Sequence, residues 1–163
     1  MLVAQLIERG AEVVGAVKTE ADAENLVRQT ASDRLTPLVF DLEDTENIAP
    51  VIAAEIAAGG PIYGLVNNAA IYPKAGIDEI PVAEIRRVLS VNALAGAALV
   101  QACLPGMKQL GSGRVVNIAS NTFDMGMEAR LHLLVQRGPR TALAGAGPRD
   151  LGRTGITPNV FPR

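Results

Sequence analysis

The amino-acid sequence predicts an α/β fold, namely a Rossmann-like doubly wound parallel sheet. Short apolar runs alternate with helix-like segments along the chain, and polar residues follow several of these runs directly. Strands that alternate with helices pair in parallel and are covered by those helices, so they are almost uniformly apolar. The chain has 163 residues and neither an internal repeat nor a linker, so we predict one domain over residues 1–163.

The first half of the chain is expected to hold two helices and two strands. Gly10 is a typical helix stop, and Thr19 is a typical helix cap. The apolar runs are short and contain β-branched residues, as strands do. The expected elements are a helix at 2–10, a strand at 12–17, a helix at 19–32 and a strand at 35–40.

The second half continues this alternation. Thr45 is the expected cap of a helix that two glycines end, and a long alanine-rich helix is expected from about Val82 to Lys108, or to a stop near Pro105. Pro158 falls inside the last strand, where it removes a hydrogen-bond donor from the ladder. The other expected elements are a helix at 45–60 and strands at 63–69, 114–120 and 155–161.

Composition narrows the class of protein. Hydrophobic residues make up 48% of the chain and charged residues 20%, which is enough for a sizeable core. A net charge of −2 gives no electrostatic basis for binding nucleic acid. The single cysteine, Cys103, excludes an internal disulfide and predicts a reducing, cytoplasmic compartment. We expect no cleavable leader at the start of the chain and no metal site.

One apolar stretch, VLSVNALAGAALVQACLPGM at 88–107, has the length of a membrane span. It contains Ser90, Asn92, Gln101 and Pro105, and it is richer in alanine than in leucine. Small residues suit a helix packed closely on a neighbour. We therefore predict a buried helix and no membrane contact.

In doubly wound sheets, ligands bind beyond the carboxyl ends of the strands. The expected strands carry Val17-Lys18, Asp41-Leu42, Asn67-Asn68-Ala69 and Ser120 at these ends. The sequence therefore predicts a site along this rim. The chain contains no glycine-rich GxGxxG turn, which would hold a pyrophosphate at a helix N-terminus.

Six segments, in order along the chain, resemble the short-chain dehydrogenase/reductase family. LVNNAA is close to the family's NNAG signature and follows a strand, as that signature does. One such motif would be weak support, whereas the ordered set is specific. The segments are ERGAEVVGAV at 8–17, Asp41-Leu42, LVNNAA at 65–70, VNALAGAALV at 91–100, GRVVNIAS at 113–120 and LGRTGITPNV at 151–160.

The resemblance implies binding of NAD(P) and hydride transfer between this cofactor and a small-molecule alcohol or ketone. By position in the family pattern, Asp41 with Leu42 would contact the adenine, and Asn67 to Ala70 would support the cofactor rim. Asn92 would order a water in the proton relay, and Ser120 would polarise the substrate oxygen.

Each of these roles has a simpler alternative. Asp41 could be a turn residue, and the two asparagines of LVNNAA could satisfy backbone groups between strands. Asn92 could be a buried polar residue with a backbone partner, and Ser120 could cap a turn. Both interpretations stay open for each residue.

The residue that ends the family's second strand usually decides between NAD and NADP. A carboxylate there binds the ribose 2′-hydroxyl of NAD. This chain has Val17-Lys18-Thr19 and no carboxylate. Lys18 could bind a 2′-phosphate, which favours NADP, or it could be a solvated lysine before a helix cap.

The positions of the family's catalytic tyrosine and lysine fall on Leu133 and Arg137. Leucine has no proton to exchange, and arginine does not titrate in the useful range. Loss of a general acid costs about 10²–10⁴ in rate, so we predict impaired catalysis. His132 is a poor substitute, because neighbouring residues on a helix point about 100° apart.

Two departures from the family pattern concern the chain as a whole. Two Gly-Pro pairs interrupt residues 128–149, where the family has a regular helix, and we interpret this as a compensated reading-frame slip, in the gene or in its determination. The family's first strand and glycine-rich turn are also missing, as in an N-terminal truncation. That strand would lie between the strands at 12–17 and 63–69, so these two are expected to close up, to accept a partner or to fold poorly.

Two alternatives to an active oxidoreductase follow. The helix at 88–104 is similar to helices through which family members form dimers and tetramers, so the chain could be a non-catalytic module that binds ligands or forms a homo-oligomer. It could also be an inactive fragment.

Overall fold

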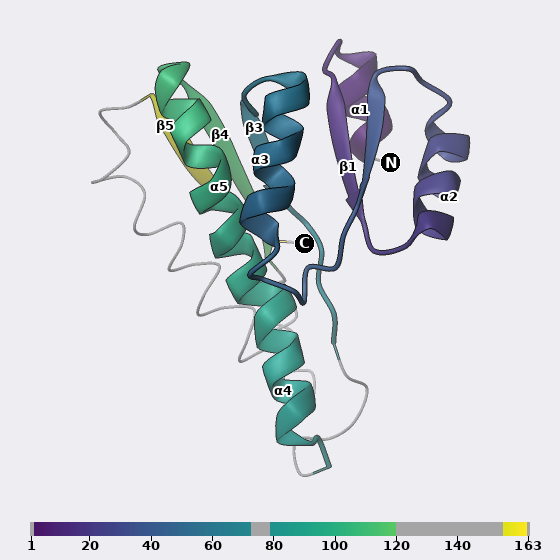
Figure 1. Ribbon diagram of the computed structural model, residues 1–163, viewed down its shortest axis with the longest axis vertical. Helices are drawn as coiled ribbons and strands as arrows, with labels where there is room; N and C mark the ends of the chain where they lie inside the picture. The colour runs from purple at the N-terminus through teal and green to yellow at the C-terminus, as the bar shows by residue number, and fades with distance from the viewer. Residues whose placement is uncertain (1, 73–78, 120–154, 163) are drawn as a thin grey trace. The chain divides into compact units, whose positions relative to one another are not determined.

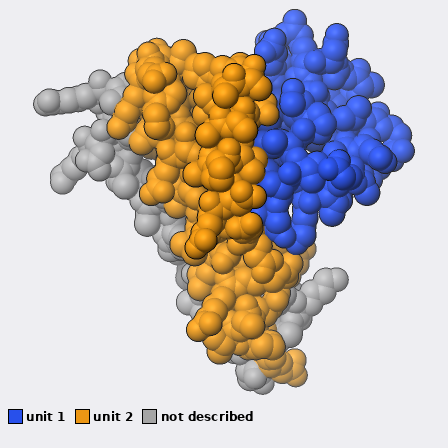
Figure 2. Space-filling model, in the orientation of Figure 1, with its two compact units in different colours: residues 1–42 blue, residues 43–163 orange. Residues whose placement is uncertain are grey.

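The computed structural model describes residues 2–72, 79–119 and 155–162. Within these residues the strands form parallel sheets and helices pack against them, which confirms the predicted α/β class (Figure 1). The chain divides into two compact units, residues 1–42 and residues 43–163 (Figure 2). Each unit is described by itself below, and the single domain over 1–163 stays a prediction.

The first unit holds two helices and a two-stranded sheet. Strands β1 and β2 run parallel, with Val13 opposite Leu35 and Val17 opposite Val39. The predicted cap of α2 is confirmed, because the Thr19 hydroxyl accepts a hydrogen bond from the Asp22 N–H at 3.2 Å. The elements are α1 (Leu2–Glu8), β1 (Val13–Val17), α2 (Glu20–Thr30) and β2 (Leu35–Val39).

Helix α2 approaches the sheet closely at Gly15. A Cβ atom built on Gly15 would lie 2.6 Å from Leu26 Cδ2 and 3.2 Å from Leu35 Cδ1, so the missing side chain leaves the space that Leu26 occupies. Leu35 and Ala23 are buried. The glycine in an otherwise apolar strand therefore has a packing role.

The second unit contains a three-stranded parallel sheet in the order β3–β4–β5. Helices α3 and α5 lie side by side in Figure 1, and α5 contacts both β3 and β4. The elements are α3 (Ile48–Gly59), β3 (Gly64–Asn67), α4 (Val82–Leu89), the π-helical turn η1 (Ser90–Leu94), α5 (Ala95–Gln109), β4 (Gly113–Ala119) and β5 (Ile156–Pro162).

The core of the second unit joins these layers. Its buried side chains come from both helices and from the sheet, and Met107 and Ile48 have no exposed surface. The buried apolar residues of α3, α5 and the strands of this unit are Ile48, Ile52, Ala95, Cys103, Met107, Val115 and Ile156.

The predicted cap at Thr45 is wrong. Helix α3 begins at Ile48 after Asn47, and a turn precedes it in which the Asn47 N–H donates to the Asp44 carbonyl oxygen at 3.2 Å. Pro50 explains the shift, because proline is accommodated only in the first turn of a helix. A helix capped at Thr45 would have placed Pro50 in its interior.

The long helix does not stop at Pro105. It continues to Gln109 with Pro105 inside it, and burial of Gly106 and Met107 beyond the proline offsets the lost hydrogen bond. By length and composition, 82–109 is the one helix among the described residues that could cross a membrane, with a mean hydropathy of 1.6. Core helices of soluble proteins pass the same test, and α5 packs on α3.

Within its own unit, each of the strands predicted at 12–17 and 63–69 has a strand partner, and what happens between these two strands stays a prediction. Among the described strands, β1 pairs with β2 and β3 pairs with β4.

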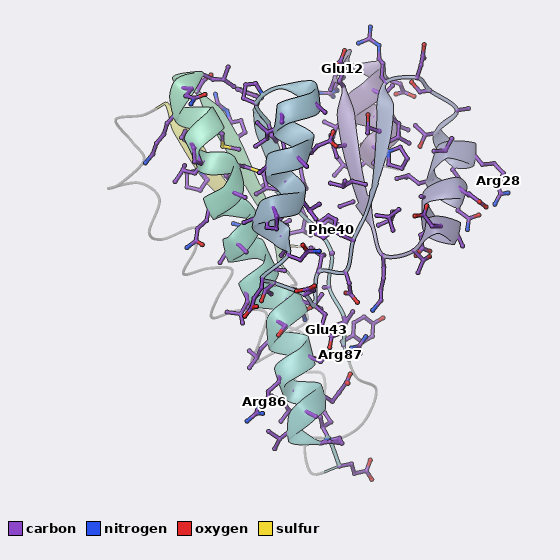
Figure 3. The ribbon with its side chains drawn as sticks, viewed as in Figure 1. Glu12, Arg28, Phe40, Glu43, Arg86 and Arg87 are labelled. Carbon is purple, nitrogen blue, oxygen red and sulfur yellow. The ribbon has the colours of Figure 1, made fainter. Side chains whose placement is uncertain are left out.

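An ion-pair network within the second unit links the last turn of α4, through Arg87, to Glu84 in its first turn and to Glu43. The Arg87 Nε lies 3.1 Å from Glu43 Oε2, and its Nη1 lies 3.0 Å from Glu84 Oε1 (Figure 3). The hydrogen bond to Glu43 is the main reason that the pKa of Arg87 is raised. Because these groups face solvent, we assign the network a role in orientation rather than a large share of stability.

Gly113 and Gly64 provide a matched test of this packing, since both lie in strands of the same sheet. A Cβ on Gly113 would lie 2.8 Å from Met107 Cβ, whereas a Cβ on Gly64 meets nothing within 4 Å. We predict that Gly113→Ala lowers the free energy of unfolding by about 1–3 kcal/mol through overpacking. Gly64→Ala should leave it unchanged or slightly raised. Urea unfolding followed by circular dichroism measures both, and equal effects would contradict this account.

Candidate functional site

In the first unit, two predicted site residues lie at the same edge of the sheet. Lys18 comes directly after β1, and Phe40 alone separates Asp41 from the end of β2. The Phe40 N–H donates to the Val17 carbonyl oxygen at 3.0 Å, which extends the parallel ladder to Phe40. Lys18 Nζ lies 2.8 Å from Asp41 Oδ2. The structure therefore brings Lys18 and Asp41 together as an ion pair.

Both partners of this pair remain accessible. The Lys18 side chain is 56% exposed and the Asp41 side chain is 39% exposed, and Leu42 beside them is half-buried. An exposed ammonium and an exposed carboxylate can both contact a nucleotide. Neither side chain is fixed by burial, so a ligand could displace one from the other.

In the second unit, the predicted rim follows the carboxyl end of β3. Asn67 is the last residue of β3 and is buried, whereas Asn68, Ala69 and Ala70 are exposed. The predicted rim therefore has one inward residue and three that face solvent. The exposed residues are the ones that a ligand can reach.

Asn67 is held by a second asparagine that the sequence analysis did not single out. Asn67 and Asn117 are opposite each other in β3 and β4, and Asn67 Nδ2 donates to Asn117 Oδ1 at 2.9 Å. The signal in the sequence was a single polar residue inside the apolar run VVNIA. Asn67 Oδ1 is buried without a hydrogen-bond partner among the described residues, so it can accept from a buried water or from a ligand.

Asn92 joins the rim to the long helix. It lies in the π-helical turn and is 2% exposed. Its Oδ1 accepts from the Ile71 N–H at 2.8 Å, and its Nδ2 donates to the Ile71 carbonyl oxygen at 2.7 Å. Ile71 also packs against Ile80 and Val88. Asn92 therefore positions the backbone that follows Asn67–Ala70. This contact is the one expected if Asn92 is a buried polar residue with a backbone partner, and its role in ordering a water stays a prediction.

The remaining predicted catalytic positions lie outside the described residues. These are Ser120, the positions of the family's tyrosine and lysine at Leu133 and Arg137, and His132. Their roles stay predictions. Cys103 is described and 1% exposed, and burial raises the pKa of its thiol to about 11, which disfavours the reactive thiolate.

Comparison with known proteins places this arrangement in a family. The short chain dehydrogenase family matches residues 1–132. The 17-beta-hydroxysteroid dehydrogenase type 6 of Bos taurus is 36% identical over 122 residues, which is 73% of this chain and 38% of that protein. The chain therefore belongs to the short-chain dehydrogenase/reductase family, although it spans well under half the length of this relative.

Solved structures agree with this assignment. A short-chain dehydrogenase from Streptomyces avermitilis superposes with a TM-score of 0.83 at 25% identity, covering 97% of this chain and 58% of that one. A blue fluorescent protein from a metagenomic library, in complex with NADPH, superposes with a TM-score of 0.82 at 27% identity, covering 97% and 66%. The family and the Rossmann-like fold predicted from the sequence are both confirmed.

Asn117 is expected to stabilise the second unit through its bond to Asn67. The near-isosteric change Asn117→Leu removes the acceptor and leaves Asn67 Nδ2 buried without a partner, so we predict a loss of about 1–3 kcal/mol in the free energy of unfolding. The exposed neighbour Asn68 serves as a control, since Asn68→Leu should change stability by less than about 0.5 kcal/mol. Urea denaturation measures the free energy of unfolding of both variants. If Asn117→Leu lowers it no more than Asn68→Leu does, the stabilising role of Asn117 is contradicted.

Proposed function

We propose that this chain serves NAD(P)-dependent oxidation and reduction, with hydride transfer between the nicotinamide and an alcohol or carbonyl substrate. The observation that carries the proposal is the exposed Lys18–Asp41 pair at the carboxyl ends of β1 and β2, in a chain that the family model matches over residues 1–132. The bound NADPH of the similar metagenomic protein supports the cofactor class.

The described residues suit part of such a cofactor. In the first unit, Lys18 and Asp41, with Leu42, offer an ammonium, a carboxylate and an apolar side chain to the adenosine end. In the second unit, the exposed residues 68–70 follow the carboxyl end of β3. No described residues form a glycine-rich turn after a strand, so they do not supply a pyrophosphate site. The bound cofactor would supply the hydride acceptor or donor.

Positioning of the rim, polarisation of the substrate and proton transfer would depend on different residues of this chain. Asn92 would hold the rim backbone through Ile71, and the acceptor at Asn67 Oδ1 would take a hydrogen bond from water or ligand. Ser120 would polarise the substrate oxygen. Leu133 cannot donate a proton at the tyrosine position, so we propose that turnover is impaired by about 10²–10⁴. The leaning towards NADP rests on Lys18, and a cytoplasmic location rests on the single cysteine and stays a prediction.

Calorimetric titration of the purified chain with NADPH and with NADH measures cofactor binding without requiring turnover. We expect saturable binding that is weak, because the residues that the structure describes supply no pyrophosphate cradle. Ala70→Tyr should weaken it at least tenfold by filling the exposed rim, whereas Ala58→Tyr, at an exposed site near the end of α3, should not. Absence of saturable binding would contradict the proposal, and turnover of a ketone at an ordinary enzymatic rate would contradict the impairment.

Homo-oligomer formation is a second part of the proposal. Three apolar side chains along 82–94 are exposed: Val82 by 65%, Leu89 by 36% and Leu94 by 55%. We expect a discrete oligomer in size-exclusion chromatography with light scattering. Leu94→Lys should shift it towards the monomer, because a charge in an apolar interface is costly. Gln101→Lys, at an exposed site on α5, serves as control, and a monomeric wild-type chain would refute this part.

A further inference from the structure

We propose that the Lys18–Asp41 ion pair sets how strongly this chain prefers a nucleotide with a 2′-phosphate over one without. In this mechanism the Asp41 carboxylate and the 2′-phosphate compete for the same Lys18 ammonium. The inference rests on the proposed nucleotide binding. It adds that Asp41, beyond any contact with adenine, determines cofactor specificity.

The geometry of the first unit places the two groups in competition range. Because β1 and β2 are parallel and in register, the residues after their ends meet at one edge of the sheet. Lys18 Nζ and Asp41 Oδ2 are 2.8 Å apart, the distance of a direct charged hydrogen bond. An ammonium in this contact has part of its charge and one of its donors already engaged.

Further carboxylates close to Lys18 in the sequence oppose the binding of a doubly charged phosphate more than that of a singly charged carboxylate. The first turn of α2 adds Glu20 and Asp22 beside Lys18, and the Asp22 carboxylate accepts a hydrogen bond from the Thr19 hydroxyl at 2.6 Å. Of the other cations in this unit, Arg28 lies in the last turn of α2 and bonds to Asn25, and Arg34 donates to the Gly10 carbonyl oxygen at 2.8 Å. Lys18 thus pairs directly with Asp41, and two more carboxylates follow it in the sequence within four residues.

The ion pair weakens the binding of a 2′-phosphate to Lys18 but does not prevent it. An exposed ion pair is weak and is screened by salt, so a phosphate dianion can displace the carboxylate. The displaced Asp41 then remains near the phosphate and repels it. Removing the Asp41 charge therefore strengthens binding of the 2′-phosphate in two ways, by freeing Lys18 and by removing a like charge.

The test compares two ligands that differ only in the 2′-phosphate, adenosine 2′,5′-bisphosphate and adenosine 5′-monophosphate. Calorimetry at low ionic strength gives the ratio of their dissociation constants. We expect Asp41→Asn, which keeps the size of the side chain, to shift this ratio about tenfold towards the bisphosphate. Lys18→Gln should remove the preference for the bisphosphate, and 0.5 M salt, roughly a 4 Å screening length, should erase most of the Asp41→Asn effect.

Asp33→Asn is the matched control, because Asp33 precedes β2 and so lies at the opposite end of the same strand. It removes the same charge from the same unit and should leave the ratio unchanged. If both ligands bind but Asp41→Asn matches Asp33→Asn, the specificity role is overturned while the proposed function stands. If the wild-type chain and both variants at 18 and 41 bind neither ligand, the inference and the proposed cofactor binding fall together.

Discussion

Parallel pairing of the strands is the constraint on which the candidate site depends. Within each sheet every strand points the same way, so polar residues that follow different strands gather at one edge. Lys18 meets Asp41 for this reason, and the parallel register of β3 and β4 places Asn67 opposite Asn117 inside the other sheet. An antiparallel pairing of the same segments would send these groups to opposite ends. The chemistry of the site thus follows from strand direction before it follows from any single residue.

Buried amides explain why polar residues persist in apolar elements of the second unit. An unpaired amide is costly to bury, so Asn67 and Asn117 are stable only when the register of β3 and β4 puts them opposite each other. The buried Asn92 amide is likewise satisfied, by two hydrogen bonds that join the π-helical turn to the Ile71 backbone. These contacts fix register and loop position, which apolar packing alone specifies less strictly.

Charge at the edge of the first unit has a different character. The Lys18–Asp41 pair is exposed, so water and salt weaken it and it adds little to stability. The contrast between the two units is physical. Buried polar groups must be satisfied and therefore define structure, whereas exposed charges can exchange partners and therefore can respond to a ligand.

The sequence by itself determined the fold class, the family, most element positions and the α2 cap at Thr19, because these depend on signals within a few residues. It also singled out Asn67 and Asn92 as polar residues in apolar surroundings. The start of α3 was misjudged because Pro50 outweighed a plausible cap, and the helix persisted through Pro105 because Met107 is buried against the core. Tertiary structure alone decided that Asn117 satisfies Asn67 and that Lys18 pairs with Asp41, since both contacts depend on the register between strands far apart in the chain.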